Sequence, residues 1–252
     1  MLSEKQGSSE PQGGSSEPQG DSSEPQGGSE ETLTTRFRFP HANTADEDGL
    51  VAVGGDLKPG TLLLAYGNGI FPWTTRPITW WSPDPRAIIP LGGLHISRSL
   101  RKVLRGGTFT VTFDRDFRAV MLGCAAPRPG REQTWITGAF ITGYTRLHAL
   151  GYAHSVEIWH GDRLAGGLYG VALGGLFAGE SMFSAEENAS KVAMAAMEEK
   201  LRSCGYLLFD VQMMTAHLRS MGAVEISRAR YLSRLREAAE ARPAFTTTAA
   251  PG

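Results

Sequence analysis

The run LAGGLYGVALGGLFAGESMF, residues 164–183, constrains the fold of this chain more than any other stretch. It holds two apolar segments of strand length that are joined at Gly174-Gly175, and paired glycines between such segments indicate a β-hairpin. A third strand pattern, YAHSVEIW, comes just before it. Three consecutive strands of this kind predict a meander, which excludes a strictly alternating Rossmann chain.

Helical patterns surround this meander. Three times a helical or turn pattern ends at a glycine and is followed by a strand pattern, in LGYAHSVEIW, CGYLLFDVQ and MGAVEIS. The order from residue 114 onward is ααβββαβαβα, which predicts an α+β fold with helices packed on a mixed sheet. Asp114 is expected to cap the first of these helices, and Ser184-x-x-Glu187 to form a capping box before the helix in NASKVAMAAMEEKLRSC. No glycine-rich phosphate loop opens a helix.

The N-terminal residues have a different character. GSSEPQG occurs at 7–13 and 14–20, and DSSEPQG follows at 21–27. The repeat has no apolar position, so residues 1–31 are predicted to be a disordered low-complexity tail rather than a coiled coil. This tail carries seven acidic residues against Lys5, whereas the rest carries 24 basic and 19 acidic residues. The remainder is thus mildly basic, which is compatible with a polyanionic partner.

The remaining residues divide by composition. Residues 32–95 are rich in Pro, Gly and Trp and predict a small N-terminal α/β domain, with a helix within 58–69 and short strands within 78–91. Residues 96–240 are expected to form the main domain, and 241–252 a disordered C-terminal tail.

Several features indicate a cytoplasmic protein. Cys124 and Cys204 lie far apart in the sequence without a CxxC motif, so we interpret them as reduced core thiols. No apolar run reaches 18 residues, and the N-terminus lacks the pattern of a signal peptide. The six histidines show no ligand spacing, so no metal is expected.

Three polar side chains are candidates for a site. Asp210 and Gln212 lie two apart on the strand YLLFDVQ, so both are expected on one face of a central strand. Glu180 lies among apolar residues of the neighbouring hairpin, where a carboxylate is costly unless it is paired. We expect the three to line one pocket that suits a cationic substrate. The alternatives are that Asp210 caps the next helix and that Glu180 pairs with Lys191 or Arg202.

Aromatic and basic residues add two further candidates. Trp73 and Trp135 lie beside turn-forming residues, and such tryptophans can stack on bases, although a core position is the alternative. In HISRSLRKVLR, four basic residues share one face at helical spacing, which suits phosphate contact or simply a solvated helix face. These are Arg98, Arg101, Lys102 and Arg105.

Long motifs then give a specific resemblance. DGLVAVGGDLKPGTLLLAYGNGIFPW, WWSPDPRAIIPL, TWIT, GGLYGVALGGLFAGESMFS, ENASK and SMGAVEISR resemble the leucyl/phenylalanyl-tRNA–protein transferases over about residues 36–235. The resemblance implies a GNAT-like acyltransferase domain that uses no cofactor, and in particular no coenzyme A. It implies transfer of Leu or Phe, and less well Met, from aminoacyl-tRNA to the N-terminal Arg or Lys of proteins, which marks them for N-end rule degradation. No membrane partner is implied.

The resemblance also implies roles for single residues. Trp73 and Trp135 match positions that hold the terminal adenosine of the tRNA, and Tyr144 matches a site tyrosine. The donor side-chain pocket is expected to include Leu168, Phe177, Glu180 and Ser181. The stripe from Arg98 to Arg105 corresponds to the face that meets the acceptor stem. Asp210 and Gln212 match a D-C-Q triplet in which Val211 replaces the cysteine, and the side chain of Val211 is expected to face away from the site.

These residues suggest a mechanism. We hypothesise that Asp210 polarises Gln212, that Gln212 orients the attacking amine, and that Glu180 faces the cationic end of the acceptor. Two other classes remain open at this point: an acyl-CoA-dependent acyltransferase, for which the pyrophosphate loop is missing, and a non-enzymatic RNA-binding module.

Overall fold

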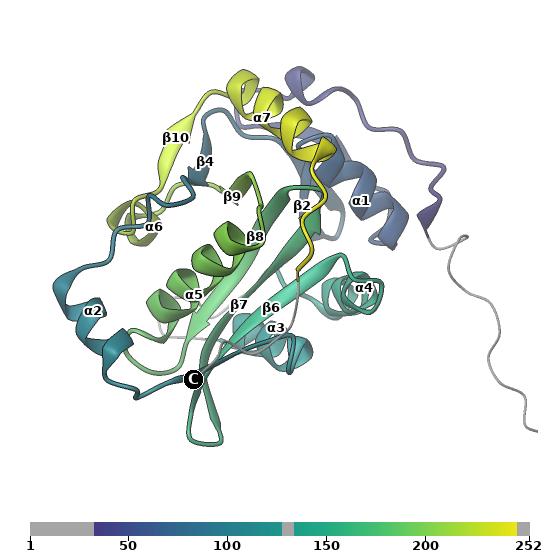
Figure 1. The fold of residues 1–252 in the computed structure, drawn as a ribbon. Coiled ribbons are helices and arrows are strands. Elements are labelled where there is room, and N and C mark those ends of the chain that lie inside the picture. The colour runs from purple at the N-terminus through teal and green to yellow at the C-terminus, as the bar shows by residue number, and fades with distance from the viewer. Residues whose placement is uncertain (1–32, 128–133, 246–252) are drawn as a thin grey trace, which may run out of the picture.

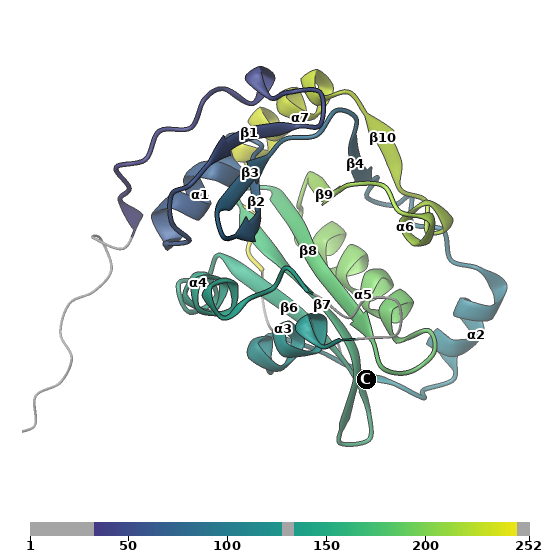
Figure 2. The same cartoon turned by 180° about the vertical axis from the view of Figure 1, so that it is seen from behind.

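A computed structural model describes residues 33–127 and 134–245 of the chain, in two sheets with helices packed around them (Figures 1 and 2). The repeats within residues 1–31 lie outside the described residues. The smaller sheet has three antiparallel strands in the order β1-β3-β2. Its strands are β1 (Leu50–Val53), β2 (Phe71–Thr75) and β3 (Ile78–Trp81), and helix α1 (Pro59–Gly67) connects the first two.

The larger sheet has seven strands in the order β10-β4-β9-β8-β7-β6-β5. Every neighbouring pair is antiparallel except β8 and β9, which run parallel. Its strands are β4 (Arg86–Ile89), β5 (Thr110–Phe113), β6 (Ala153–His160), β7 (Arg163–Leu173), β8 (Leu176–Ser184), β9 (Leu208–Gln212) and β10 (Val224–Ile226). The parallel pair is possible because helix α5 (Ala189–Ser203) crosses back between the two strands.

Helices cover both faces of the larger sheet (Figures 1 and 2). One core lies under α1, α3 (Phe117–Ala125), α4 (Gly138–Ala149) and α7 (Arg228–Glu240). The other lies under α2 (Arg98–Arg105), α5 and α6 (Ala216–Ser220). Successive strand residues alternate between the two cores: Leu168 faces the α5 side and Tyr169 the α4 side. The sheet is therefore apolar on both faces, which explains its near-continuous apolar strands.

The predicted order ααβββαβαβα from residue 114 onward is confirmed, including the hairpin at Gly174-Gly175. Strands β1, β2 and β5 were not predicted. Cys124 is buried and Cys204 partly buried, and neither forms a disulfide within the described residues. Among the described residues, no helix combines the length and the apolar character that crossing a membrane requires.

Two predicted helix caps are wrong. Asp116, not Asp114, caps α3. Asp114 follows β5, and its carboxylate instead accepts a hydrogen bond from the backbone N–H of Ser155 at 2.8 Å and lies 2.7 Å from Nδ1 of His154. The predicted capping box at Ser184 does not form, because Ser184 still belongs to β8 and α5 begins only at Ala189.

The domain division expected at residue 95 stays a prediction, but the two sheets divide earlier. Strand β4 precedes that boundary and lies inside the larger sheet, between β10 and β9. At the other end, residues 241–245 of the expected C-terminal tail are described. There the ring of Phe245 stacks on His154 with centroids 4.0 Å apart. Residues 246–252 lie outside the described part.

Candidate active site

The site lies where β8 and β9 part. Their parallel pairing ends at Ala178 and Asp210, and both strands continue beyond these residues. A cavity of about 290 Å³ opens there. Its walls come from β2, the segment before α4, β7, the middle of β8, α5, the end of β9 and the segment that leads from β9 into α6. The lining residues are Phe71, Pro72, Trp73, Trp135, Leu168, Gly179, Glu180, Ser181, Met182, Met194, Val211, Gln212, Met213, Thr215 and Leu218.

Each of the two strands carries a β-bulge at this point. On β8, Gly179 pairs with Gly170 and Ser181 with Tyr169, so Glu180 is an extra residue in the ladder. On β9, Asp210 pairs with Ile88 and Gln212 with Ala87, which makes Val211 the extra residue. A bulge redirects the side chains beside it. Consecutive residues of each strand, Glu180-Ser181 and Val211-Gln212, therefore line the same cavity.

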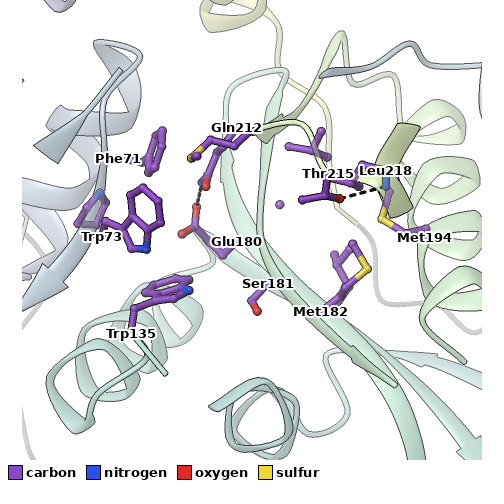
Figure 3. A pocket seen from close by; sticks show the side chains of 15 residues that line it. Phe71, Trp73, Trp135, Glu180, Ser181, Met182, Met194, Gln212, Thr215 and Leu218 are labelled. Carbon is purple, nitrogen blue, oxygen red and sulfur yellow. Dashed lines mark hydrogen bonds between the residues drawn. The ribbon is translucent and has the colours of Figure 1, made fainter. Parts of the chain in front are cut away.

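The cavity has two sides (Figure 3). On one side of β8, the aromatic group lies beside Glu180 and Gln212; it consists of Phe71, Trp73 and Trp135. On the other side lies the apolar group: Met182, Met194 and Leu218 are seen there, and Leu168 belongs to the same core as Met194 and Leu218. The cavity thus joins a polar contact and flat rings to an apolar recess.

Glu180 is buried, with 8% of its surface exposed, and is held by two neutral donors. The hydroxyl of Tyr144 donates to its Oε2 at 3.1 Å, and Nε2 of Gln212 donates to its Oε1 at 2.7 Å. The hydroxyl of Tyr66 is hydrogen-bonded to that of Tyr144. Among the described residues, Glu180 forms no ion pair, and Arg202 pairs with Glu199 instead. The alternative of an internal ion pair with Lys191 or Arg202 is therefore wrong.

Because Glu180 is buried without an ion pair among the described residues, its pKa is raised. Burial raises the pKa of Glu180 from 4.5 to about 7, although the hydroxyls of Tyr66 and Tyr144 oppose the shift. Burial likewise raises the pKa values of both tyrosines well above 10, so their hydroxyls remain donors. The carboxyl of Glu180 therefore exchanges its proton near neutral pH, which suits a group that takes a proton from an amine.

Asp210 does not line the cavity, although it was predicted to. It is fully buried on the α7 side of the sheet, where Arg86 clamps it: Nε donates to Oδ1 at 2.9 Å and Nη2 to Oδ2 at 2.6 Å. The hydroxyl of Tyr231 also donates to Oδ2 at 2.8 Å, and the backbone N–H of Gln212 to Oδ1 at 2.8 Å. With its oxygens occupied and its charge balanced, Asp210 does not contact the side-chain amide of Gln212. The alternative of a helix cap is wrong too, since Thr215 caps α6.

The comparisons with known proteins identify the family. The family model described as "Leucyl/phenylalanyl-tRNA protein transferase" matches residues 88–236, and the one described as its N-terminal domain matches residues 55–84. A curated protein of Syntrophobacter fumaroxidans named leucyl/phenylalanyl-tRNA–protein transferase is 55% identical over 208 residues, which cover 81% of this chain and 89% of that protein.

Two further relatives carry the same name. The protein of Anaeromyxobacter sp. is 53% identical, over 80% of this chain and 88% of its own length. The protein of Shewanella baltica is 50% identical, over 80% of this chain and 86% of its own length. The chain belongs to the leucyl/phenylalanyl-tRNA–protein transferase family. The prediction that it is an enzyme of this family is confirmed.

In this transferase, most of the predicted site residues come together. Trp73, Trp135, Leu168 and Ser181 line the cavity with Glu180 and Gln212, and Tyr144 lies behind Glu180 as its donor. Both tryptophans are half-buried, and they pack edge-on against Trp81 and Phe140. By contrast, Trp80 is a core residue with 1% of its surface exposed.

Two predictions about side-chain direction are wrong. Phe177 does not line the cavity, because it precedes the bulge and packs in the α5-side core against Phe209, with ring centroids 5.6 Å apart. Val211 does line the cavity, because it lies on the α5 side of the sheet with Phe209, and that side of β9, opposite to Asp210, faces the cavity.

The four basic residues of α2 lie on one exposed face of that helix, as their spacing predicts, and Leu100 is buried on the opposite face. They do not line the cavity. Within the described residues, no three His, Cys, Asp or Glu side chains gather so that they could hold a metal ion.

Several residues in or behind this site were not predicted. Four line the cavity, namely Phe71, Met182, Met194 and Leu218. Three lie behind it, namely Tyr66, Arg86 and Tyr231. Of these residues, Arg86 could have been found from the sequence. Arg86 opens the apolar run RAIIPL, where a charge needs a partner just as Glu180 does.

Proposed function

We propose that this enzyme transfers Leu or Phe, and less well Met, from aminoacyl-tRNA to the N-terminal Arg or Lys of proteins. The observation that carries the proposal is the Glu180–Gln212 contact at the wall of a cavity that has an apolar recess on one side and aromatic rings on the other. The family to which the chain belongs supports it. The GNAT-like character of the larger sheet, a role in N-end rule degradation and a cytoplasmic location belong to the same proposal.

The donor occupies the cavity in two parts. The side chain of the esterified amino acid enters the recess of Leu168, Met182 and Met194. These lining side chains are apolar, so the recess suits Leu, Phe or Met. The terminal adenosine of the tRNA stacks on Trp73 or Trp135, a contact worth about 1–3 kcal/mol per base. The ester group then lies between these parts, near Glu180 and Gln212. The basic face of α2 meets the phosphates of the acceptor stem.

The acceptor binds through its charge. Glu180 as a carboxylate is desolvated and has no ionic partner among the described residues, so a cationic N-terminus supplies the missing charge. The side-chain Nε2 of Gln212 is engaged with Glu180, which leaves its Oε1 to accept a hydrogen bond from the amine. The amine is thereby directed at the ester.

The reaction needs one proton removed from the ammonium and one supplied to the leaving oxygen. Glu180, whose pKa is about 7, takes a proton from the acceptor ammonium, whose ordinary pKa is near 8. The neutral nitrogen attacks the ester carbonyl carbon and forms the amide bond. The bond from that carbon to the ribose oxygen breaks. The nitrogen, which is cationic after its attack, gives up its second proton, and this proton passes to the ribose oxygen, which leaves as a hydroxyl. Asp210 does not polarise the side-chain amide of Gln212 in this mechanism, because its oxygens accept hydrogen bonds from Arg86, Tyr231 and the backbone of Gln212.

A transfer assay tests the proposal. Purified enzyme is mixed with tRNA charged with labelled Leu, Phe, Met or Ile, and with peptides that differ only in a first residue of Arg, Lys, Ala or Glu. Label should pass from Leu and Phe, and more weakly from Met, to the Arg and Lys peptides. Transfer to all four peptides alike would contradict the acceptor assignment, and transfer from acetyl-CoA instead of aminoacyl-tRNA would contradict the donor assignment.

A further inference from the structure

Arg86 lies outside the cavity, yet it contacts two elements of its wall, β2 and β9. Its guanidinium carbon is 4.7 Å from the ring centre of Phe71, which lines the cavity, and its Nη1 donates to the carbonyl of Gly69 at 3.2 Å. On the opposite side it lies 4.4 Å from the ring centre of Tyr231. Its Nε and Nη2 grip Asp210 in a bidentate pair. Arginine is suited to this position because its planar fork matches a carboxylate and its faces stack on rings.

Arg86 is connected to the backbone of Gln212 through Asp210. Oδ1 of Asp210 accepts both from Nε of Arg86 and from the backbone N–H of Gln212. Gln212 has a φ of 63°, a left-handed conformation that a residue with a Cβ adopts only at a cost. Such a conformation persists where the surroundings fix it. The carboxylate that fixes this one is itself oriented by Arg86.

The backbone of Gln212 in turn decides where its amide points. In a regular strand, Gln212 would share a face with Asp210 and point toward α7. The bulge at Val211 and the left-handed turn at Gln212 instead bring Nε2 to within 2.7 Å of Oε1 of Glu180, at the cavity wall.

We infer that Arg86 is a positioning residue of the transfer reaction: through Asp210 it holds the strained turn at Gln212, and so holds the Gln212 amide on Glu180. This inference rests on the proposed function for its kinetic consequences, but not for its structural ones. Arg86 touches no substrate, and its effect on the reaction passes through Gln212.

Arg86→Lys tests the inference, because lysine keeps the positive charge but cannot donate the two parallel hydrogen bonds of the guanidinium to Asp210. We expect kcat for transfer to fall about 10- to 100-fold, the cost of a small misplacement of a reacting group, while KM for aminoacyl-tRNA changes less than about threefold. Tyr231→Phe, which removes one donor to Asp210 and keeps the ring, should give a smaller loss of the same kind and covers the case in which Arg86→Lys does not fold. Arg202→Lys, at an exposed pair, is the matched control and should leave kcat unchanged.

A double-mutant cycle separates positioning from general support. In a Gln212→Ala background, Arg86→Lys should lower kcat less than about twofold further, because the group it positions is gone. If Arg86→Lys costs the same factor in both backgrounds, the inference is overturned.

An activity-independent measurement separates this inference from the proposed function. The side-chain amide signal of Gln212 in ¹H–¹⁵N spectra, identified by its loss in Gln212→Ala, should move in Arg86→Lys toward its position in urea-unfolded protein. It should stay in place in Arg202→Lys. An unmoved signal in folded Arg86→Lys would contradict the inference. A moved signal in a protein that transfers nothing from any aminoacyl-tRNA would leave the inference intact and remove the proposed function.

Discussion

Nε2 of Gln212 lies 2.7 Å from Oε1 of Glu180, so the end of β9 and the bulge of β8 meet in one polar contact at the cavity wall. The contact solves the problem of a carboxylate among apolar residues only in part. Two neutral donors reduce the cost of burying Glu180, but they do not balance its charge. A site that keeps an unbalanced carboxylate is prepared for a cation.

The first prediction concerns stability and pH. Because the folded-state pKa of Glu180, about 7, exceeds its ordinary value of 4.5, the folded protein binds this proton more tightly than the unfolded chain does. The contribution of Glu180 to stability is therefore fully present below pH 4.5 and is lost as the pH rises through 7. The loss is on the order of 3 kcal/mol.

Glu180→Gln removes this titration. Unfolding by urea at pH values from 4.5 to 8 should show that the stability of Glu180→Gln relative to the unsubstituted protein rises across this range. Equal pH dependence of the two proteins would show that Glu180 titrates at its ordinary pKa.

The second prediction concerns Asp210. Asp210→Asn leaves the buried guanidinium of Arg86 without its counter-charge, and removal of one partner from a buried pair costs about 3–5 kcal/mol. Urea unfolding measures the loss, and Asp162→Asn, at an exposed turn, is the control. A loss below about 1 kcal/mol would mean that the pair contributes little to the fold.

The third prediction concerns the aromatic group. Trp73→Ala and Trp135→Ala should each raise KM for aminoacyl-tRNA by about 5- to 150-fold, which corresponds to 1–3 kcal/mol of lost stacking. Trp159→Ala is the control, because Trp159 is also partly buried but lies outside the cavity, against Arg115. Thermal destabilisation similar to that of Trp159→Ala with unchanged KM would assign Trp73 and Trp135 to the core alone.

The fourth prediction concerns the choice of donor. Met194→Ala enlarges the recess, so transfer of Leu should fall more than transfer of Phe, and the ratio of their kcat/KM values should shift by about 5- to 100-fold toward Phe, within the limit set by apolar contacts. Met197→Ala, on the same helix and fully buried outside the cavity, should leave the ratio unchanged. An unchanged ratio in Met194→Ala would place the donor side chain elsewhere.

The fifth prediction concerns α2. If its basic face contacts phosphates, Arg101→Ala and Lys102→Ala should each reduce the slope of log affinity for tRNA against log salt by about 0.7–0.9. Arg230→Ala and Arg236→Ala, on exposed positions of α7, are the controls. A slope that falls equally in both pairs would indicate a diffuse electrostatic effect without a docking face.

The sequence by itself determined the order of the elements from residue 114 onward and much of the site. Glycines that end helices, the Gly174-Gly175 hairpin and the periodicity of the helices are local signals, so they can be interpreted without the partner strands. A lone carboxylate in an apolar strand also needs no structure to be noticed. Hence the strand patterns predict that Glu180 and Gln212 share a pocket, with Asp210 as a third member, whereas the role of Trp73 and Trp135 follows from the family resemblance.

The tertiary structure decided which way the side chains point and which charges are balanced. Arg86 and Asp210 are 124 residues apart, and their pairing depends on the register of β4 against β9. A bulge moves all later side chains of a strand relative to its partner, and its effect depends on how distant segments pair. Asp210 therefore turned away from the cavity and Val211 turned into it, because strand pairing between distant segments, rather than local preference, sets the faces of this sheet.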